Sequence, residues 1–370
     1  MSFEITFLGT SGGPLELGNC AILVKPALLL YSAILESRDR PLFSIDAGSG
    51  WHALAEVILS DRRYALETPS PQNGNLGQLA LYEDSLQPHE YLNVPYTYPY
   101  SKLEGSPLML LQQIFSKMSA LLLSHPHLDH IQAMVLNLAG GCESQEKTTM
   151  YGSKFTTDAL NTHVFNGVIW PDLVLLGMLE LETVTQEKKF SIAQNRYKVT
   201  YFEVSHGVVA NKGRHEGPYS SLAFLVCDQE NSAKMLVFGD FEADSILREE
   251  KNSLIWKHVA PFILDGSLKC VILECSTYSR QPGVNLYGHM TPVHVMAELQ
   301  RLETFCVEKA GKRQSSSFVK NLNVIVTHVK ETYDSRDPRR RILKELQQLN
   351  NSLGLHLNIS IATNGILVVV

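Results

Sequence analysis

The stretch Ser124-His125-Pro126-His127-Leu128-Asp129-His130 places three imidazoles and a carboxylate within six residues. It follows the apolar run Ala120–Leu123, which predicts a buried strand, so the motif occupies the loop at the end of that strand. Its first two histidines can converge on one metal ion if the loop turns, whereas the aspartate and the third histidine point toward a second ion or a bound water. We interpret the stretch as a metal-binding loop; a polar surface turn is the alternative.

Three later segments each end an apolar run with a possible metal ligand. The candidates are His206, Asp240 and His328, which follow the runs Thr200–Val204, Met235–Phe238 and Val324–Val326. Asp240 can bridge two ions, because Gly239 lets the backbone approach closely. Taken singly, each of these residues is also typical of a structural histidine or a turn aspartate.

With this order of ligands, the chain resembles the metallo-β-lactamase fold superfamily, whose signature is a His-x-His-x-Asp-His loop followed by separate His, Asp and His ligands. The resemblance implies two Zn²⁺ ions per chain, with Mn²⁺ and Fe²⁺ as alternative metals. One zinc is then held by His125, His127 and His206, the other by Asp129, His130 and His328, and Asp240 bridges them.

The same resemblance assigns roles to two aspartates. The two zinc ions share a hydroxide as the nucleophile, and Asp129 orients it and accepts its proton during attack. Asp46 closes the early strand Leu42–Ile45 and supports the ligand loop through hydrogen bonds without binding metal. An ordinary turn aspartate before a glycine is the other interpretation of Asp46.

Segments outside the ligand set are similar to the class II cyclic nucleotide phosphodiesterases. These are His163–Asp172, Leu286–Pro292 and Thr327–Lys330, and the segments Glu4–Pro14 and Arg336–Arg339 resemble the fungal low-affinity cAMP enzymes of that family. The resemblance implies that the chain cleaves the 3′ ester of cyclic AMP, and of cyclic GMP, to give a 5′-monophosphate and so lowers second-messenger signalling. A transfer-RNA 3′-processing endonuclease and a thioester hydrolase are the alternative enzymes. A scaffold protein without chemistry is disfavoured, because every ligand position is filled.

Contacts with the substrate are predicted at a few positions. His289 lies just before a predicted helix start and can contact a phosphate oxygen or protonate the departing 3′ oxygen, although a capping or packing histidine is the alternative. Phe165 and Asn166 have the character of a base-binding segment, with core packing as the alternative. Glu274 follows the strand Val271–Leu273 and is expected to open toward the metals.

The 370 residues, 44% of them hydrophobic, can bury one large core, so we expect a single domain over residues 1–370 with insertions near residues 61–117. The resemblance implies an α/β fold, a four-layer αββα sandwich of two mixed sheets flanked by helices. Thr68–Asn75 predicts a surface loop. The tyrosine- and proline-rich arm Pro88–Tyr100 packs either on the chain's own core or in a homodimer interface.

Strands and helices follow from the apolar periodicity. The predicted strands are Phe3–Leu8, Cys20–Val24, Leu42–Ile45, Ala120–Leu123, Lys198–Val204, Leu222–Cys227, Met235–Phe238, Val271–Leu273 and Val324–Val326. The predicted helices are His52–Leu59, Ile131–Leu138, Asp244–His258, Pro292–Glu308 and Arg339–Asn351. Ala27–Asp39 is expected to be an extended hairpin or loop.

Charge and cysteine content restrict the partners. A net charge of -6 disfavours long nucleic acid, and the one compact basic run, Arg339–Arg341, is expected to be a solvated helix face. Six cysteines form no Cys-x-x-Cys pair, and no signal peptide is recognised, so reduced thiols are expected. Without an apolar run of about eighteen residues, we expect no membrane partner and a cytoplasmic enzyme.

Overall fold

Two mixed β-sheets face each other in the computed structural model, which describes residues 2–66, 77–140, 147–185, 189–211, 214–279, 285–311 and 315–370. Within these residues each sheet has seven strands. The first sheet has the order β14-β1-β2-β3-β4-β5-β6 and the second the order β13-β12-β11-β10-β9-β8-β7. In each sheet, parallel pairing lies toward one end and antiparallel pairing toward the other.

The strands of the first sheet are β1 (Phe3–Gly9), β2 (Ala21–Pro26), β3 (Leu42–Ile45), β4 (Met118–Leu122), β5 (Thr148–Gly152), β6 (Leu179–Thr183) and β14 (Leu367–Val369). Those of the second are β7 (Phe190–Ile192), β8 (Tyr197–Asn211), β9 (Arg214–Asp228), β10 (Lys234–Phe238), β11 (Leu268–Glu274), β12 (Asn323–Thr327) and β13 (Asn358–Ile361). The inner faces enclose a core that includes Phe7, Phe43, Phe224 and Ile272.

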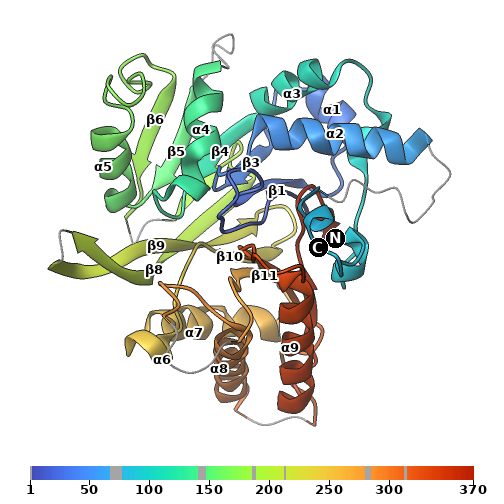
Figure 1. Cartoon of the computed structure of the whole chain (residues 1–370), viewed down its shortest axis with the longest axis vertical. Coiled ribbons are helices and arrows are strands. Elements are labelled where there is room, and N and C mark those ends of the chain that lie inside the picture. The colour runs from blue at the N-terminus through green and yellow to red at the C-terminus, as the bar shows by residue number, and fades with distance from the viewer. Residues whose placement is uncertain are drawn as a thin grey trace.

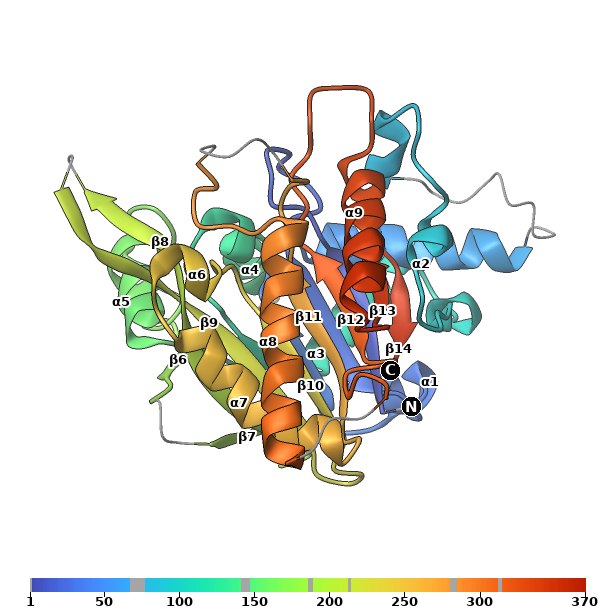
Figure 2. The ribbon, with the colours of Figure 1, turned by 90° about the horizontal axis from the view of Figure 1, so that it is seen from below.

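Helices cover the outer face of each sheet, which confirms the predicted αββα sandwich (Figure 1). On the first sheet lie α1 (Tyr31–Glu36), α2 (Trp51–Leu66), α3 (Pro107–Ser116), α4 (Leu128–Gly140) and α5 (Lys154–His163). On the second side lie α6 (Asp244–Leu247), α7 (Lys251–Leu264), α8 (Pro292–Ala310) and α9 (Pro338–Leu353). Figure 2 shows α7, α8 and α9 lying across the second sheet. Among the described residues, no helix combines the length and apolarity needed to cross a membrane.

The predicted helix Asp244–His258 is wrong, because the structure has two helices there. Arg248 adopts a left-handed conformation with φ 57° and ends α6. The carboxylate of Asp244 then accepts hydrogen bonds from the backbone N–H groups of Asn252 and Ser253 at 3.0 and 2.8 Å, so it caps the first turn of α7. Ala27–Asp39 is also corrected, because it contains α1, which buries Tyr31 and Ile34.

The segment 61–117 packs on the rest of the chain wherever it is described. It includes the 3₁₀ helices η1 (Gly77–Leu81), η2 (Pro88–Tyr91) and η3 (Pro99–Lys102), whereas the predicted loop Thr68–Asn75 lies outside the described residues. In the arm Pro88–Tyr100, the backbone N–H of Tyr100 donates to Asp61 at 3.1 Å, and its hydroxyl bonds that of Tyr31 at 2.8 Å. The arm therefore packs on its own chain. A homodimer stays a prediction, and these contacts of the arm do not argue for it.

Arg339 does not belong to a solvated face, which corrects the expectation for the run Arg339–Arg341. Its side chain is 1% exposed and pairs with Glu331 and Asp337. Asp337 also caps α9 and accepts a hydrogen bond from the hydroxyl of Tyr91. This buried network ties the arm and the segment after His328 to the start of α9.

Candidate active site

The predicted ligand residues meet at one edge of the two sheets. Strands β10, β11 and β12 are parallel, so their carboxyl ends lie together, and β4 ends at the same edge in the first sheet. The turns after β4, β10 and β12 carry the ligand loop, Asp240 and His328. His206 lies on the long strand β8, which β9 links to β10.

Three imidazoles form a first group in which all ligand atoms lie within 4.8 Å of one another: His125, His127 and His206. Nε2 of His125 and Nδ1 of His127 are 2.9 Å apart. Burial and the neighbouring imidazoles lower the pKa of all three, that of His127 to about 4. All three are therefore neutral near pH 7, and the neutral imidazole is the form that binds metal.

A second group consists of Asp129, His130, Asp240 and His328. Nε2 of His328 lies 3.1 Å from Oδ2 of Asp240 and 3.3 Å from Oδ2 of Asp129. Although burial lowers the pKa of His328, the carboxylates of Asp240, Asp129 and Glu274 together outweigh burial and raise the pKa to about 10. This half of the site therefore favours positive charge, which a proton or a metal cation can supply.

Asp240 lies between the two groups. Its Oδ1 is 3.4 Å from Nε2 of His130, while its Oδ2 is 3.8 Å from Nε2 of His125 and 3.7 Å from Nε2 of His206. The carboxylate is thus within 4 Å of imidazoles from both groups, as a bridging ligand requires. A small cavity of about 20 Å³ adjoins Asp240, His130, His328 and Cys20.

A second observation also indicates that these residues suit a divalent metal. Nδ1 of His130 bonds Oδ2 of Asp46 at 2.8 Å, and Asp46 also accepts hydrogen bonds from the N–H and hydroxyl of Ser124. With Nδ1 engaged, Nε2 of His130 is buried without a hydrogen-bond partner in the described structure. A buried ring nitrogen oriented in this way by a carboxylate is characteristic of a metal-binding histidine. Asp46, with φ 57°, thus hydrogen-bonds to two residues of the ligand loop, and its supporting role stays a prediction.

His289 is also at this site, held by Glu274. Nδ1 of His289 lies 3.1 Å from both carboxylate oxygens of Glu274. Glu274 itself is buried and accepts hydrogen bonds from the N–H of Phe241 and the hydroxyl of Ser276. Burial alone would raise the pKa of Glu274, but the imidazole of His289 outweighs it and lowers the pKa. Glu274 was expected to contact the substrate. This expectation is corrected, because the buried Glu274 carboxylate instead contacts Nδ1 of His289.

The predicted base-binding residues do not lie beside the metal groups. Phe165 is 0% exposed and packs in the core under α4 and α5, so its ring cannot stack on a ligand. Asn166 is exposed, but it forms the turn after α5 by accepting hydrogen bonds from the N–H groups of Val168 and Ile169. The opposite end of α5 is the one that approaches the site, and ten helical residues span roughly 15 Å.

Three further residues at the site are not among the ligands and substrate contacts predicted from the sequence. The ring of Tyr219 lies 4.5 Å from that of His127, and the hydroxyl of Ser276 contacts Nδ1 of His328 at 2.9 Å. The thiol of Cys20 lies within 4.8 Å of the ligand atoms of His130 and His328. Tyr219 was not predicted, because the predicted strand began at Leu222, whereas β9 begins at Arg214.

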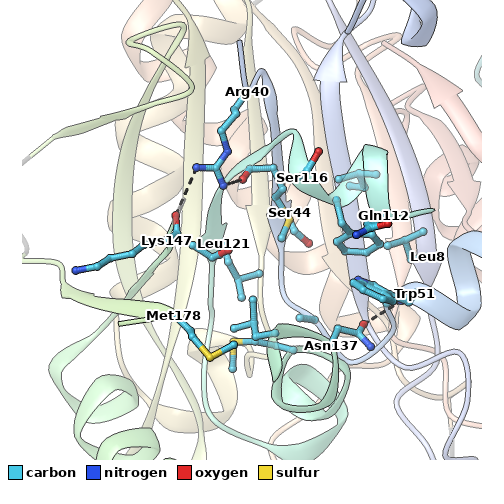
Figure 3. Close-up of a pocket in the computed structure, with 18 of the residues that line it drawn as sticks. Leu8, Arg40, Ser44, Trp51, Gln112, Ser116, Leu121, Asn137, Lys147 and Met178 are labelled. Atoms are coloured by element: carbon cyan, nitrogen blue, oxygen red, sulfur yellow. Dashed lines mark hydrogen bonds between the residues drawn. The ribbon is translucent and has the colours of Figure 1, made fainter. Parts of the chain in front are cut away.

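A larger cavity of about 390 Å³ lies on the outer face of the first sheet (Figure 3). Leu121 of β4 is among its lining residues, with α3 contributing Gln112 and α4 contributing Asn137. Figure 3 shows Arg40 and Trp51 toward opposite ends of this cavity. None of the predicted metal ligands lines it.

Comparison with known proteins agrees with this geometry. The family model of the class-II cAMP phosphodiesterases matches residues 44–365. A 3′,5′-cyclic-nucleotide phosphodiesterase of Candida albicans is 32% identical, with 100% of both chains covered. The crystal structure of unliganded yeast PDE1 superposes with a TM-score of 0.81 at 30% identity, covering 100% of this chain and 99% of that one.

The fold is shared more widely. The metallo-β-lactamase fold protein YhfI of Bacillus subtilis superposes with a TM-score of 0.51 at 13% identity, covering 99% of this chain and 98% of that one. At that identity the likeness concerns the fold alone. The family match over most of the chain, together with the relatives at 30% identity or more, is specific: the chain belongs to the class-II cAMP phosphodiesterases, enzymes that hydrolyse 3′,5′-cyclic nucleotides.

Proposed function

We propose that the chain cleaves the 3′ ester bond of cyclic AMP and of cyclic GMP at a centre that holds two zinc ions, releasing the 5′-monophosphate. The position of Asp240 is the observation that carries this proposal, because its carboxylate lies within 4 Å of imidazoles from both groups. Removing the cyclic nucleotide lowers the second-messenger signal.

His125, His127 and His206 would hold one ion, and Asp129, His130 and His328 the other, with Asp240 between them. When bound, the two cations lower the pKa of a water molecule and neutralise charge on the phosphoryl group. Nitrogen and carboxylate ligands suit zinc, with Mn²⁺ and Fe²⁺ as the alternatives.

Asp129 is the proposed acceptor of the proton from the attacking water. Its side chain is 29% exposed, whereas that of Asp240 is 3% exposed, so Asp129 is the carboxylate of the second group that reaches solvent. The water oxygen forms the new bond to phosphorus as the bond to the 3′ oxygen breaks. Asp129 thus combines a ligand role with a base role.

His289 is the proposed donor of a proton to the departing 3′ oxygen. Glu274 engages its Nδ1, which leaves Nε2 as the atom that can donate to the substrate. A carboxylate that fixes one ring nitrogen also stabilises the protonated ring, so Glu274 and His289 act as a unit.

The whole chain is the proposed catalytic unit, acting as one domain. Asp46 and the ligand loop come from the first sheet, whereas His206, Asp240 and His328 come from the second. Neither sheet can assemble the site without the other.

The test is turnover by metal-free protein reloaded with zinc, using cyclic AMP, cyclic GMP, a thioester and an unprocessed transfer RNA in parallel. We expect both cyclic nucleotides to be hydrolysed with two zinc ions bound per chain, measured by elemental analysis. Turnover of the thioester or the RNA alone would contradict the proposal, and full activity with one ion per chain would contradict the two-metal centre.

A further inference from the structure

The base of the substrate needs a flat apolar surface one ribose ring away from the metals, and Phe165 and Asn166 do not provide one. We propose that Tyr219, supported by Phe155, is the wall on which the base of the cyclic nucleotide stacks. The inference rests on the proposed function, because it concerns the same site and the same substrate.

The ring of Tyr219 is placed directly beside the first group of imidazoles. Its centroid lies 4.5 Å from that of His127, with an interplanar angle of 30°, and 5.8 Å and 6.0 Å from those of His206 and His125. A phosphate held at these imidazoles therefore has an aromatic ring next to it. Stacking on such a ring accepts any base, because every base has a π-face.

The pairing of β8 with β9 fixes this position. Ser205 pairs with Ser220 and Val208 with Pro218, and the register shifts between them. His206 and Gly207 on β8 thus stand opposite Tyr219 alone on β9. Such irregularities redirect side chains next to active sites, and this one brings a metal-ligand histidine and a tyrosine to the same place.

Phe155 supports the ring from a second element. It lies in the first turn of α5, whose start is fixed by the hydroxyl of Ser153 accepting from the N–H of Thr156 at 3.2 Å. The rings of Phe155 and Tyr219 meet edge-on at 5.0 Å and 82°, which favours one orientation of the tyrosine. A ring held in this way loses little freedom when a base stacks on it.

Apolar side chains are exposed around this wall although the site itself is polar. Phe155 is 39% exposed, and Leu128, between two predicted ligands, is 72% exposed. Single exposed apolar residues are ordinary, but here Phe155 contacts the ring of Tyr219, and Leu128 directly follows the predicted ligand His127 in the chain. An uncharged aromatic base is the part of a cyclic nucleotide that matches such a surface.

The test compares two ligands that differ only in the base, 5′-AMP and ribose 5-phosphate, by titration calorimetry on the zinc-loaded protein. In Tyr219→Leu we expect the Kd of 5′-AMP to rise about tenfold and that of ribose 5-phosphate to change by less than about twofold. Tyr219→Phe should retain 5′-AMP binding, because the ring remains. Phe155→Ala should weaken 5′-AMP binding, because Phe155 supports the ring of Tyr219 from α5. The KM for cyclic AMP should rise in parallel, with kcat nearly unchanged.

Tyr96→Leu is the matched control, because Tyr96 is also partly exposed and meets Tyr98 edge-on at 5.8 Å in the arm outside the site. It should leave both dissociation constants unchanged. An unchanged Kd for 5′-AMP in Tyr219→Leu, or an equal loss for both ligands, would overturn the inference, since the second result means that Tyr219 only positions His127. Failure of the unmodified protein to hydrolyse cyclic AMP would instead refute the proposed function.

Discussion

The side chains of the candidate centre are oriented by partners that lie outside the two groups of possible metal ligands. Asp46 engages Nδ1 of His130, the carbonyl of Gly288 lies 2.7 Å from Nδ1 of His206, and Ser276 contacts Nδ1 of His328. In each case the other ring nitrogen, Nε2, faces Asp240. These contacts select one tautomer of each ring before a metal arrives, which reduces the cost of assembling the site.

Replacing Asp240 tests the bridge at the level of one residue. Asp240→Asn keeps the shape of the side chain but removes the negative charge that two cations would share. We expect the zinc content to fall from two ions to at most one per chain and the rate of cyclic AMP hydrolysis to fall more than about a hundredfold. Asp244→Asn, four residues away and outside the site, is the control; two bound ions in Asp240→Asn would refute the bridge.

Replacing His289 separates a proton donor from a metal ligand. His289→Asn should lower kcat by about 10² to 10⁴ while both zinc ions stay bound. Glu274→Gln should give a smaller loss in kcat with unchanged zinc, because Glu274 acts through the ring of His289 and His289 itself remains. Elemental analysis of the zinc content, measured beside the kinetics, distinguishes the two roles. Loss of zinc from His289→Asn would mean that His289 is a metal ligand.

At the scale of elements, the site depends on where strands end. The carboxyl ends of neighbouring parallel strands share an edge, so ligands separated by many residues in the sequence come together. The apolar runs before the ligand loop, Asp240 and His328 made these strand ends predictable. The strands β5, β6, β7, β13 and β14 were not predicted, because each has only three to five residues, which is too short to show a period.

Helix boundaries depended on side-chain contacts that periodicity does not contain. Asp244 lies within a continuous helical pattern, yet its carboxylate caps α7 eight residues later. Likewise, Tyr219 was missed because its position depends on the register of β8 and β9, and Phe165 was misplaced because an aromatic residue near a functional motif can equally belong to the core. Residue types predicted the metal chemistry, whereas substrate contacts required the fold.

The capping contact makes a prediction for the stability of α7. Asp244→Ala removes the acceptor for two backbone N–H groups, so we expect the free energy of unfolding to fall by about 1 to 2 kcal/mol. Urea titration followed by circular dichroism measures the change. Asp158→Ala, which removes only an exposed ion pair with Lys154, should change it by less than about 0.5 kcal/mol. Equal effects of the two substitutions would mean that Asp244 does not cap the helix.

For the whole molecule, burial of Asp61 makes stability depend on pH. Burial raises the pKa of Asp61 from 3.8 to about 7, although the hydrogen bond from the N–H of Tyr100 lowers this pKa. Between these values the unfolded chain has lost the proton that the folded protein retains, so this group destabilises the fold increasingly as the pH rises from about 4 to about 7.

Asp61→Asn should remove this dependence while keeping an acceptor for Tyr100. Relative to the unmodified protein, the variant should gain up to a few kcal/mol of unfolding free energy at pH 8, and the gain should shrink toward pH 4. Chemical denaturation at a series of pH values measures the difference, with exposed Asp158→Asn as control. A difference that does not vary with pH would show that Asp61 titrates normally in the folded protein.

The proposed centre requires side chains from both sheets to gather around two cations. Anomalous diffraction at the zinc edge, on crystals of the zinc-loaded protein, locates those cations. We expect two peaks about 3.5 to 4 Å apart, with the Asp240 carboxylate in contact with both. One peak should lie beside His125, His127 and His206, and the other beside Asp129, His130 and His328. A single peak, or two peaks that leave Asp240 uncoordinated, would contradict the proposed centre.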